Sequence, residues 1–171
     1  GASPPAPSDD KPTRTTEAAG GQGRQSDPAV RQAVELHAEQ VAEDWLTGLG
    51  YEVERVGHIK PYDLRAKKDD TSLCVEVKGS VKTLDTVSLT KNEVEIARNA
   101  LHTLLVVVDQ ITWKQETNGQ ISTSGGQRRE WWGWRAAADR LTATEYRYQL
   151  PPSDPAPDST PSRGPRPDGR Y

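Results

Sequence analysis

The chain has 171 residues, a formal net charge of −3 and 27% charged residues. The length suggests one domain, and the charge argues against a protein that binds nucleic acid through its overall basicity. There is no apolar run long enough for a membrane span and no signal-peptide pattern, so we expect no association with a membrane.

The two ends of the chain differ from its middle. Residues 1–26 are rich in Pro, Gly, Ser, Thr and Ala, and residues 151–171 are Pro-rich without an apolar period. Such segments bury too little apolar surface to offset their chain entropy, so we expect two disordered tails around one domain at 27–150. The absence of Met indicates a piece of a longer polypeptide with further domains. A single cysteine, Cys74, excludes an internal disulfide and fits a reducing compartment, so we expect a cytoplasmic protein.

The first predicted element is a long amphipathic helix. Asp27 followed by Pro28 is typical of an N-cap and first helical position. Apolar residues then recur at helical spacing as far as Leu49, and Gly48 and Gly50 mark the end.

Three strands are predicted next, at residues 51–57, 61–67 and 72–79. The first alternates in polarity, the second begins with a proline, and the polar turn 68–71 joins it to the third. Such short connections indicate an antiparallel meander.

A second helix follows, with Thr90 and Glu93 forming a capping box and Val94, Ala97 and Leu101 forming its apolar stripe. The apolar run 104–108 is typical of a central strand covered on both faces, and the intervening helix makes it parallel to the third strand.

The pattern weakens beyond Asp109. Residues 111–116 and 127–134 suggest an added hairpin, and residues 146–150 suggest a last short strand.

Asp63, Glu76 and Lys78 are the candidate catalytic group. In a strand, Leu73, Val75 and Val77 would face the core, which leaves Glu76 and Lys78 together on the other face. Antiparallel pairing brings Asp63 of the preceding strand beside Glu76. The charges of Glu76 and Lys78 alone would indicate a solvated face, but the nearby Asp63 favours a site.

These residue types suit the cleavage of phosphodiester bonds. Two carboxylates can hold Mg²⁺ or Mn²⁺, which prefer oxygen ligands. The ion activates a bound water, and a nearby lysine orients that water or stabilises the developing charge. We assign Glu93 no chemistry, because the capping box accounts for it.

Pro61, Asp63, Glu76 and Lys78 resemble the motif of the PD-(D/E)XK nuclease superfamily, although Tyr62 separates the proline from the aspartate. PYDL at 61–64, VEVKG at 75–79 and LTKNEVEIAR at 89–98 resemble the domain named after the C-terminal part of the plant protein NO VEIN. The resemblance spans roughly residues 30–150. It implies an α/β fold with a restriction-endonuclease-like core (helix, three-strand meander, helix, parallel strand), to which the C-terminal hairpin is added.

The resemblance implies a Mg²⁺- or Mn²⁺-dependent nuclease acting on nucleic acid, with DNA expected, in a bacterial restriction or phage-defence protein. Asp63 and Glu76, with the Val77 carbonyl, are expected to hold the metal, and Lys78 to assist the attacking water. The alternative is a non-catalytic domain of the same fold that binds nucleic acid or a protein. The sequence leaves open DNA or RNA, endo- or exonuclease action, sequence preference and oligomeric state.

Related nucleases often place one more glutamate on the first helix, and Glu35 and Glu39 are the candidates. If Ala38 and Trp45 mark the middle of the apolar face, Glu35 points about 60° from it and Glu39 about 100°. A carboxylate within a buried face needs a partner, which a metal-bound water would supply. We therefore favour Glu35, although it could instead pair with Arg31, and Glu39 stays open.

Overall fold

The computed structural model describes residues 27–145 and 147–151. The tails expected at 1–26 and, except for Pro151, at 151–171 lie outside these residues. The elements in chain order are helix α1 (Pro28–Gly48), strands β1 (Glu52–Arg55), β2 (Leu64–Lys68) and β3 (Thr71–Gly79), helix α2 (Lys91–Asn99), strands β4 (Thr103–Gln115) and β5 (Ile121–Trp132), and a short 3-10 helix (Ala138–Arg140). No helix in this part of the chain is long and apolar enough to cross a membrane.

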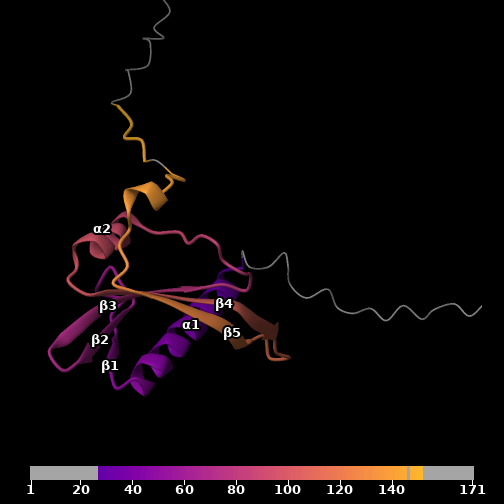
Figure 1. The fold of residues 1–171 in the computed structure, drawn as a ribbon. Coiled ribbons are helices and arrows are strands. Elements are labelled where there is room, and N and C mark those ends of the chain that lie inside the picture. The colour runs from indigo at the N-terminus through magenta and orange to yellow at the C-terminus, as the bar shows by residue number, and fades with distance from the viewer. Residues whose placement is uncertain (1–26, 146, 152–171) are drawn as a thin grey trace, which may run out of the picture.

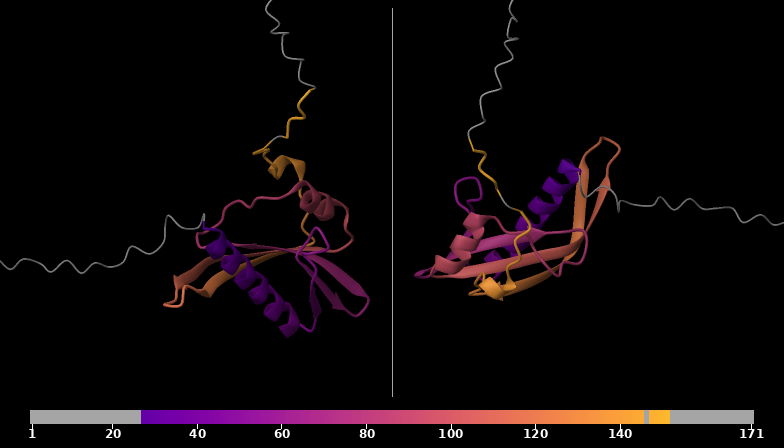
Figure 2. Two further views of the ribbon diagram at one scale, coloured as in Figure 1. Left: turned by 180° about the vertical axis from the view of Figure 1, so that it is seen from behind. Right: turned by 90° about the horizontal axis from the view of Figure 1, so that it is seen from above.

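The strands form one mixed sheet in the order β1-β2-β3-β4-β5. Neighbouring strands are antiparallel except β3 and β4, which are parallel and joined through α2. The fold is therefore α/β, with the predicted sequence of helix, meander, helix and parallel strand. Helices α1 and α2 lie on opposite sides of the sheet (Figures 1 and 2).

Helix α1 supplies one side of the core. The Asp27 side chain accepts a hydrogen bond from the Ala29 N–H at 2.9 Å, as expected of an N-cap. The helix buries one residue in every turn against Leu73, Val75 and Val77 of β3 and their neighbours in the sheet. These helix residues are Val30, Val34, Ala38, Ala42 and Leu46.

Close approach of α1 to β3 depends on Gly79, the last residue of the strand. A Cβ at this position would lie 2.9 Å from the Ala38 side chain and 2.9 Å from the Val34 carbonyl oxygen. Glycine is therefore required where the helix crosses the end of the strand.

Helix α2 begins as predicted but is shorter. The Thr90 hydroxyl accepts a hydrogen bond from the Glu93 N–H, and the Glu93 carboxylate accepts one from the Thr90 N–H. The prediction that Leu101 continues its apolar stripe was wrong, since Leu101 is 82% exposed. The helix ends at Asn99, because the backbone of Ala100 is extended.

The C-terminal hairpin is not a separate addition to the sheet. The strand predicted at 111–116 is the second half of β4, whose residues 103–109 are all buried. Its partner β5 begins at Ile121 rather than at residue 127. Gly125-Gly126 lies inside β5, where strand pairing is interrupted opposite Gln110, and both Gln110 and Gly126 have positive φ.

The last predicted strand is not present in the part of the chain that is described. Residues 147–150 have no strand structure, and Tyr146 lies outside the described residues. Residues 147–150 are exposed and pair with no described strand, and a short segment without a partner does not form a stable strand.

Candidate metal-binding and catalytic site

A cavity of about 280 Å³ lies at the carboxyl end of β3. Its wall is formed by α1, the residue before β2, the last residues of β3 and the first turn of α2. The lining residues are Glu35, Glu39, Asp63, Glu76, Val77, Lys78, Gly79 and Glu93. The four residues predicted from the sequence to be catalytic therefore share one cavity.

Asp63 lies one residue before β2, because this strand begins at Leu64 and not at Pro61 as predicted. The chain turns after Val56, whose carbonyl accepts hydrogen bonds from Ile59 and Lys60, and Pro61 has no N–H to contribute to a ladder. The Asp63 backbone is still fixed, with its N–H bound to Val75 and its carbonyl bound to Val56 and Gly57.

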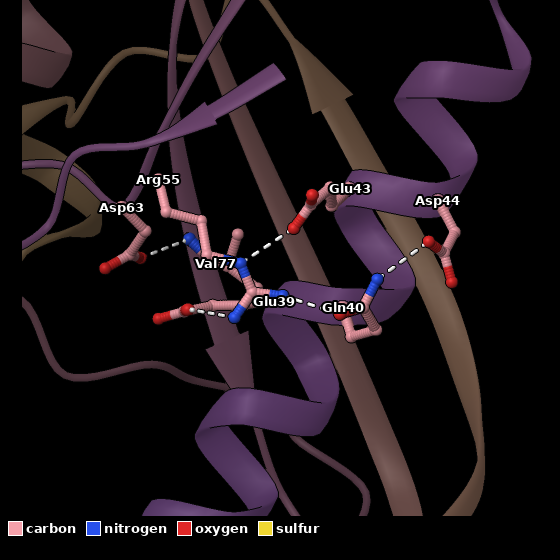
Figure 3. A network of polar contacts seen from close by, with 7 residues as sticks. All are labelled: Glu39, Gln40, Glu43, Asp44, Arg55, Asp63 and Val77. Atoms are coloured by element: carbon pink, nitrogen blue, oxygen red, sulfur yellow. Dashed lines mark hydrogen bonds and ion pairs between the residues drawn. The ribbon is translucent and has the colours of Figure 1, made fainter.

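The Asp63 side chain takes the place of the missing strand residue. Its Oδ2 accepts a hydrogen bond from the Val77 N–H at 2.8 Å, a group that a longer β2 would have bonded (Figure 3). The N–H and C=O of one strand residue point to the same side of the strand. The Val77 carbonyl therefore points toward Asp63 as well, and Val77 lines the cavity.

Glu76 and Lys78 project from the same face of β3, as their spacing predicts. Glu76 is only 5% exposed, and its Oε1 lies 2.7 Å from the Lys78 Nζ. Leu73, Val75 and Val77 belong to the core cluster, which confirms the predicted division of the two faces. A buried carboxylate beside an ammonium needs this pairing to offset its desolvation.

Glu93 also lines the cavity, although its sequence pattern predicts only a capping role. Its Oε2 lies 3.2 Å from the Lys78 Nζ while also accepting the Thr90 N–H of the capping box. Lys78 is therefore held between carboxylates of β3 and α2. The capping role was a sufficient local explanation for Glu93, and only the approach of α2 to β3 reveals the second contact.

The two helix glutamates both line the cavity, but the burial that favoured Glu35 was predicted wrongly. Glu35 is exposed, whereas Glu39 is half-buried. Each glutamate directly follows a buried residue, Val34 or Ala38, so both lie about 100° from the buried stripe. The difference in exposure comes from the neighbouring chain, since Arg55 of β1 covers Glu39. No ion pair joins Glu35 to Arg31 in the described part of the chain; Glu39 instead pairs with Arg55.

Negative charge dominates the cavity, which has five carboxylates and one lysine. Burial, together with the charge of Asp63, raises the pKa of Glu76 to about 8. Burial also raises the pKa of Asp63, and burial and the charge of Asp63 raise the pKa of Glu39. Burial alone would lower the pKa of Lys78, but its contacts with Glu76 and Glu93 raise it. The carboxyl groups thus repel one another, and a cation would relieve that repulsion.

The donor atoms suit a hard divalent cation. Among the described residues, no three His, Cys, Asp or Glu side chains are already arranged to hold a metal. Mg²⁺ in proteins commonly uses one or two carboxylates and keeps several waters. Asp63, Glu76 and the Val77 carbonyl fit such a partly hydrated ion.

Comparison with known proteins supports the resemblance to the NO VEIN C-terminal domain. The family model of the C-terminal domain of the protein NO VEIN matches residues 32–119. The chain belongs to this family. No curated protein and no solved structure matches the chain. The NO VEIN C-terminal match contains every lining residue of the cavity and ends before β5, so it is shorter than the expected span of 30–150.

Proposed function

We propose that this chain is a metal-dependent nuclease domain of the PD-(D/E)XK type, with DNA as its substrate, in a bacterial restriction or phage-defence protein. The observation that carries the proposal is the convergence of Asp63, Glu76 and Lys78 on one acid-rich cavity at the end of β3. The order of elements, from α1 through the meander to α2 and β4, agrees with the restriction-endonuclease-like core that this assignment requires.

The metal would be Mg²⁺ or Mn²⁺, held by Asp63, Glu76 and the Val77 carbonyl. When bound, it would neutralise phosphate charge and lower the pKa of a coordinated water. The protein's own contribution is to hold two carboxylates close together despite their repulsion. It does so through the hydrogen bonds that fix the Asp63 backbone and side chain.

Lys78 would orient the attacking water or stabilise the charge that develops on the phosphate. It faces the same cavity and is fixed at both sides by Glu76 and Glu93. Glu93 would matter here because it would keep a contact with Lys78 if Glu76 bound the cation. Lys78 would then stay in place while the Glu76 carboxylate is free to bind the metal.

Glu39 is the better candidate for the additional helix carboxylate. The charges of both helix glutamates interact with that of Asp63, but only Glu39 is partly buried and held by an ion pair with Arg55. Glu35 lines the same cavity from a more exposed position.

A cleavage assay tests the proposal with supercoiled plasmid, linear DNA and RNA, each with Mg²⁺ or Mn²⁺. The variants Asp63→Ala, Glu76→Ala and Lys78→Ala should each lose activity by about a hundredfold or more while remaining folded. Lys67→Ala is the matched control, because Lys67 is an exposed lysine farther along β2 and is not among the residues that line the cavity.

The pattern of results separates the alternatives. Metal-dependent cleavage that is retained by Lys67→Ala and lost by the three site variants supports a nuclease. Cleavage that persists in the Asp63, Glu76 and Lys78 variants contradicts the site assignment. Binding of nucleic acid without cleavage by the parent protein would favour a non-catalytic binding domain.

A further inference from the structure

Glu39 is held at the cavity by an arginine from another element. Arg55, the last residue of β1, directs its guanidinium toward α1 (Figure 3). Its NH1 lies 3.4 Å from the Glu39 Oε2, its Nε 2.7 Å from the Glu43 Oε2, and its NH2 2.8 Å from the Gln40 Oε1. All three nitrogens of the guanidinium are therefore used on one face of α1.

Helix α1 also fixes the orientation of the Arg55 guanidinium. The Gln40 Nε2 donates to the Asp44 Oδ1 at 2.8 Å, which leaves the Gln40 Oε1 facing Arg55 (Figure 3). Arg55 and its two glutamates are each only about a third exposed, with side-chain exposures of 35%, 25% and 30%. A guanidinium with three fixed partners has little freedom to leave them.

The end of β1 also fixes Asp63. The Val56 and Gly57 N–H groups, which directly follow Arg55, donate to the Asp63 carbonyl at 2.8 and 3.1 Å. The segment 55–57 thus holds an α1 carboxylate through a side chain and Asp63 through the backbone. Because Glu39 and Asp63 repel each other, this segment opposes their separation.

We propose that Arg55 is a positioning residue that holds Glu39 beside Asp63, so that the helix carboxylate can serve the cation site. This inference rests on the proposed function. The alternative is that Arg55 only attaches β1 to α1. In that case it would act through Glu43 and Gln40 and would have no effect on the cavity. Lysine at position 55 would keep the charge but could not reproduce the three-nitrogen arrangement.

The test is a double-mutant cycle on the affinity of the full chain for Mn²⁺, measured by electron paramagnetic resonance and by calorimetry. The proteins are the parent, Arg55→Lys, Glu39→Gln and the double variant. Arg55→Lys should weaken Mn²⁺ binding by about tenfold, and this loss should disappear in the Glu39→Gln background. Arg65→Lys is the control, because Arg65 also makes an ion pair on the same sheet, but its partner Glu54 does not line the cavity, whereas Glu39 does.

Each outcome decides the inference. An equal loss in both backgrounds, or an Arg55→Lys protein that behaves like Arg65→Lys, overturns it. If the parent binds no Mn²⁺, both the proposed metal site and this inference fail. If Arg55→Lys does not fold, Glu43→Gln replaces it, since this variant removes the shortest anchor of Arg55 and should weaken binding in the same Glu39-dependent way.

Discussion

Burial favours the neutral form of the Glu76 carboxyl group, whereas the proposed metal binding requires its charged form. Burial and the nearby charge of Asp63 raise the pKa of the Glu76 carboxyl group from the ordinary value of 4.5 to about 8. The folded protein therefore binds more protons than the unfolded chain between these two pH values. A proton bound only in the folded state stabilises it, so this contribution is fully present below about pH 4.5 and is lost as the pH rises toward 8.

We expect the metal-free protein to lose stability as the pH rises from about 5 to 8. Asp63 and Glu39, whose pKa values are also raised, act in the same direction. Glu76→Gln should flatten the profile, because it removes a contribution that can reach about 1.4 kcal/mol per pH unit. Urea denaturation of both proteins across this range measures the difference. Identical slopes would mean that Glu76 keeps an ordinary pKa.

The two glutamates of α1 give a second residue-scale prediction. Glu39→Gln should lower metal-dependent cleavage by about tenfold or more, because Glu39 is the half-buried helix carboxylate and is held in place by Arg55. Glu35→Gln should have the smaller effect, since Glu35 is exposed. Cleavage rates and melting temperatures of both variants provide the comparison. The reverse order would return the role to Glu35.

At the scale of elements, the site depends on how closely α1 approaches the end of β3. Gly79 allows this approach, and it follows directly after Lys78. Gly79→Ala would push a methyl group against the Val34 carbonyl oxygen and the Ala38 side chain. Because a carbonyl oxygen of the helix backbone cannot turn aside as a side chain can, the helix itself would have to shift.

We expect Gly79→Ala to cost about 1–3 kcal/mol of unfolding free energy and to reduce metal affinity. The control is Gly48→Ala at the last residue of α1, where an added Cβ meets nothing within 4 Å. That change should leave stability equal or raise it by about 0.5 kcal/mol. Chemical denaturation of both variants measures the effect, and a neutral Gly79→Ala would show that α1 is free to move away from β3.

At the scale of the whole molecule, the cavity is assembled from α1, the chain before β2, the end of β3 and the start of α2. An unfolded chain does not hold these segments together, so a cation held in the cavity by Asp63 and Glu76 would bind only the folded state. Such a ligand stabilises the protein in proportion to the logarithm of its concentration above its dissociation constant.

We therefore expect the melting temperature to rise with increasing Mn²⁺ or Mg²⁺ in the millimolar range. The shift should be lost in an Asp63→Asn, Glu76→Gln double variant, whose carboxamides are weaker ligands for these ions. Differential scanning calorimetry with and without a chelator measures it. A shift that survives the double variant would place the cation elsewhere on the molecule.

Much of the fold was predictable because its signals are local. The cap at Asp27, the period of α1, the alternation along β3 and the Thr90–Glu93 capping box each depend on residues within a few positions of one another. The proximity of Asp63 and Glu76 was predictable for the same reason, since a short turn joins their strands.

The sequence by itself therefore determined the order of the elements and the central acidic group of the cavity. Only the tertiary structure decided that Glu93 contacts Lys78 and that Glu39 is half-buried while Glu35 is exposed. It also decided that Arg55 forms ion pairs with α1. These contacts join residues that are far apart along the chain, and they depend on the angle at which α1 crosses the sheet and on where α2 meets β3. A one-dimensional pattern records which face a side chain takes on its own element, but the distance between two elements is set by the packing of the whole core.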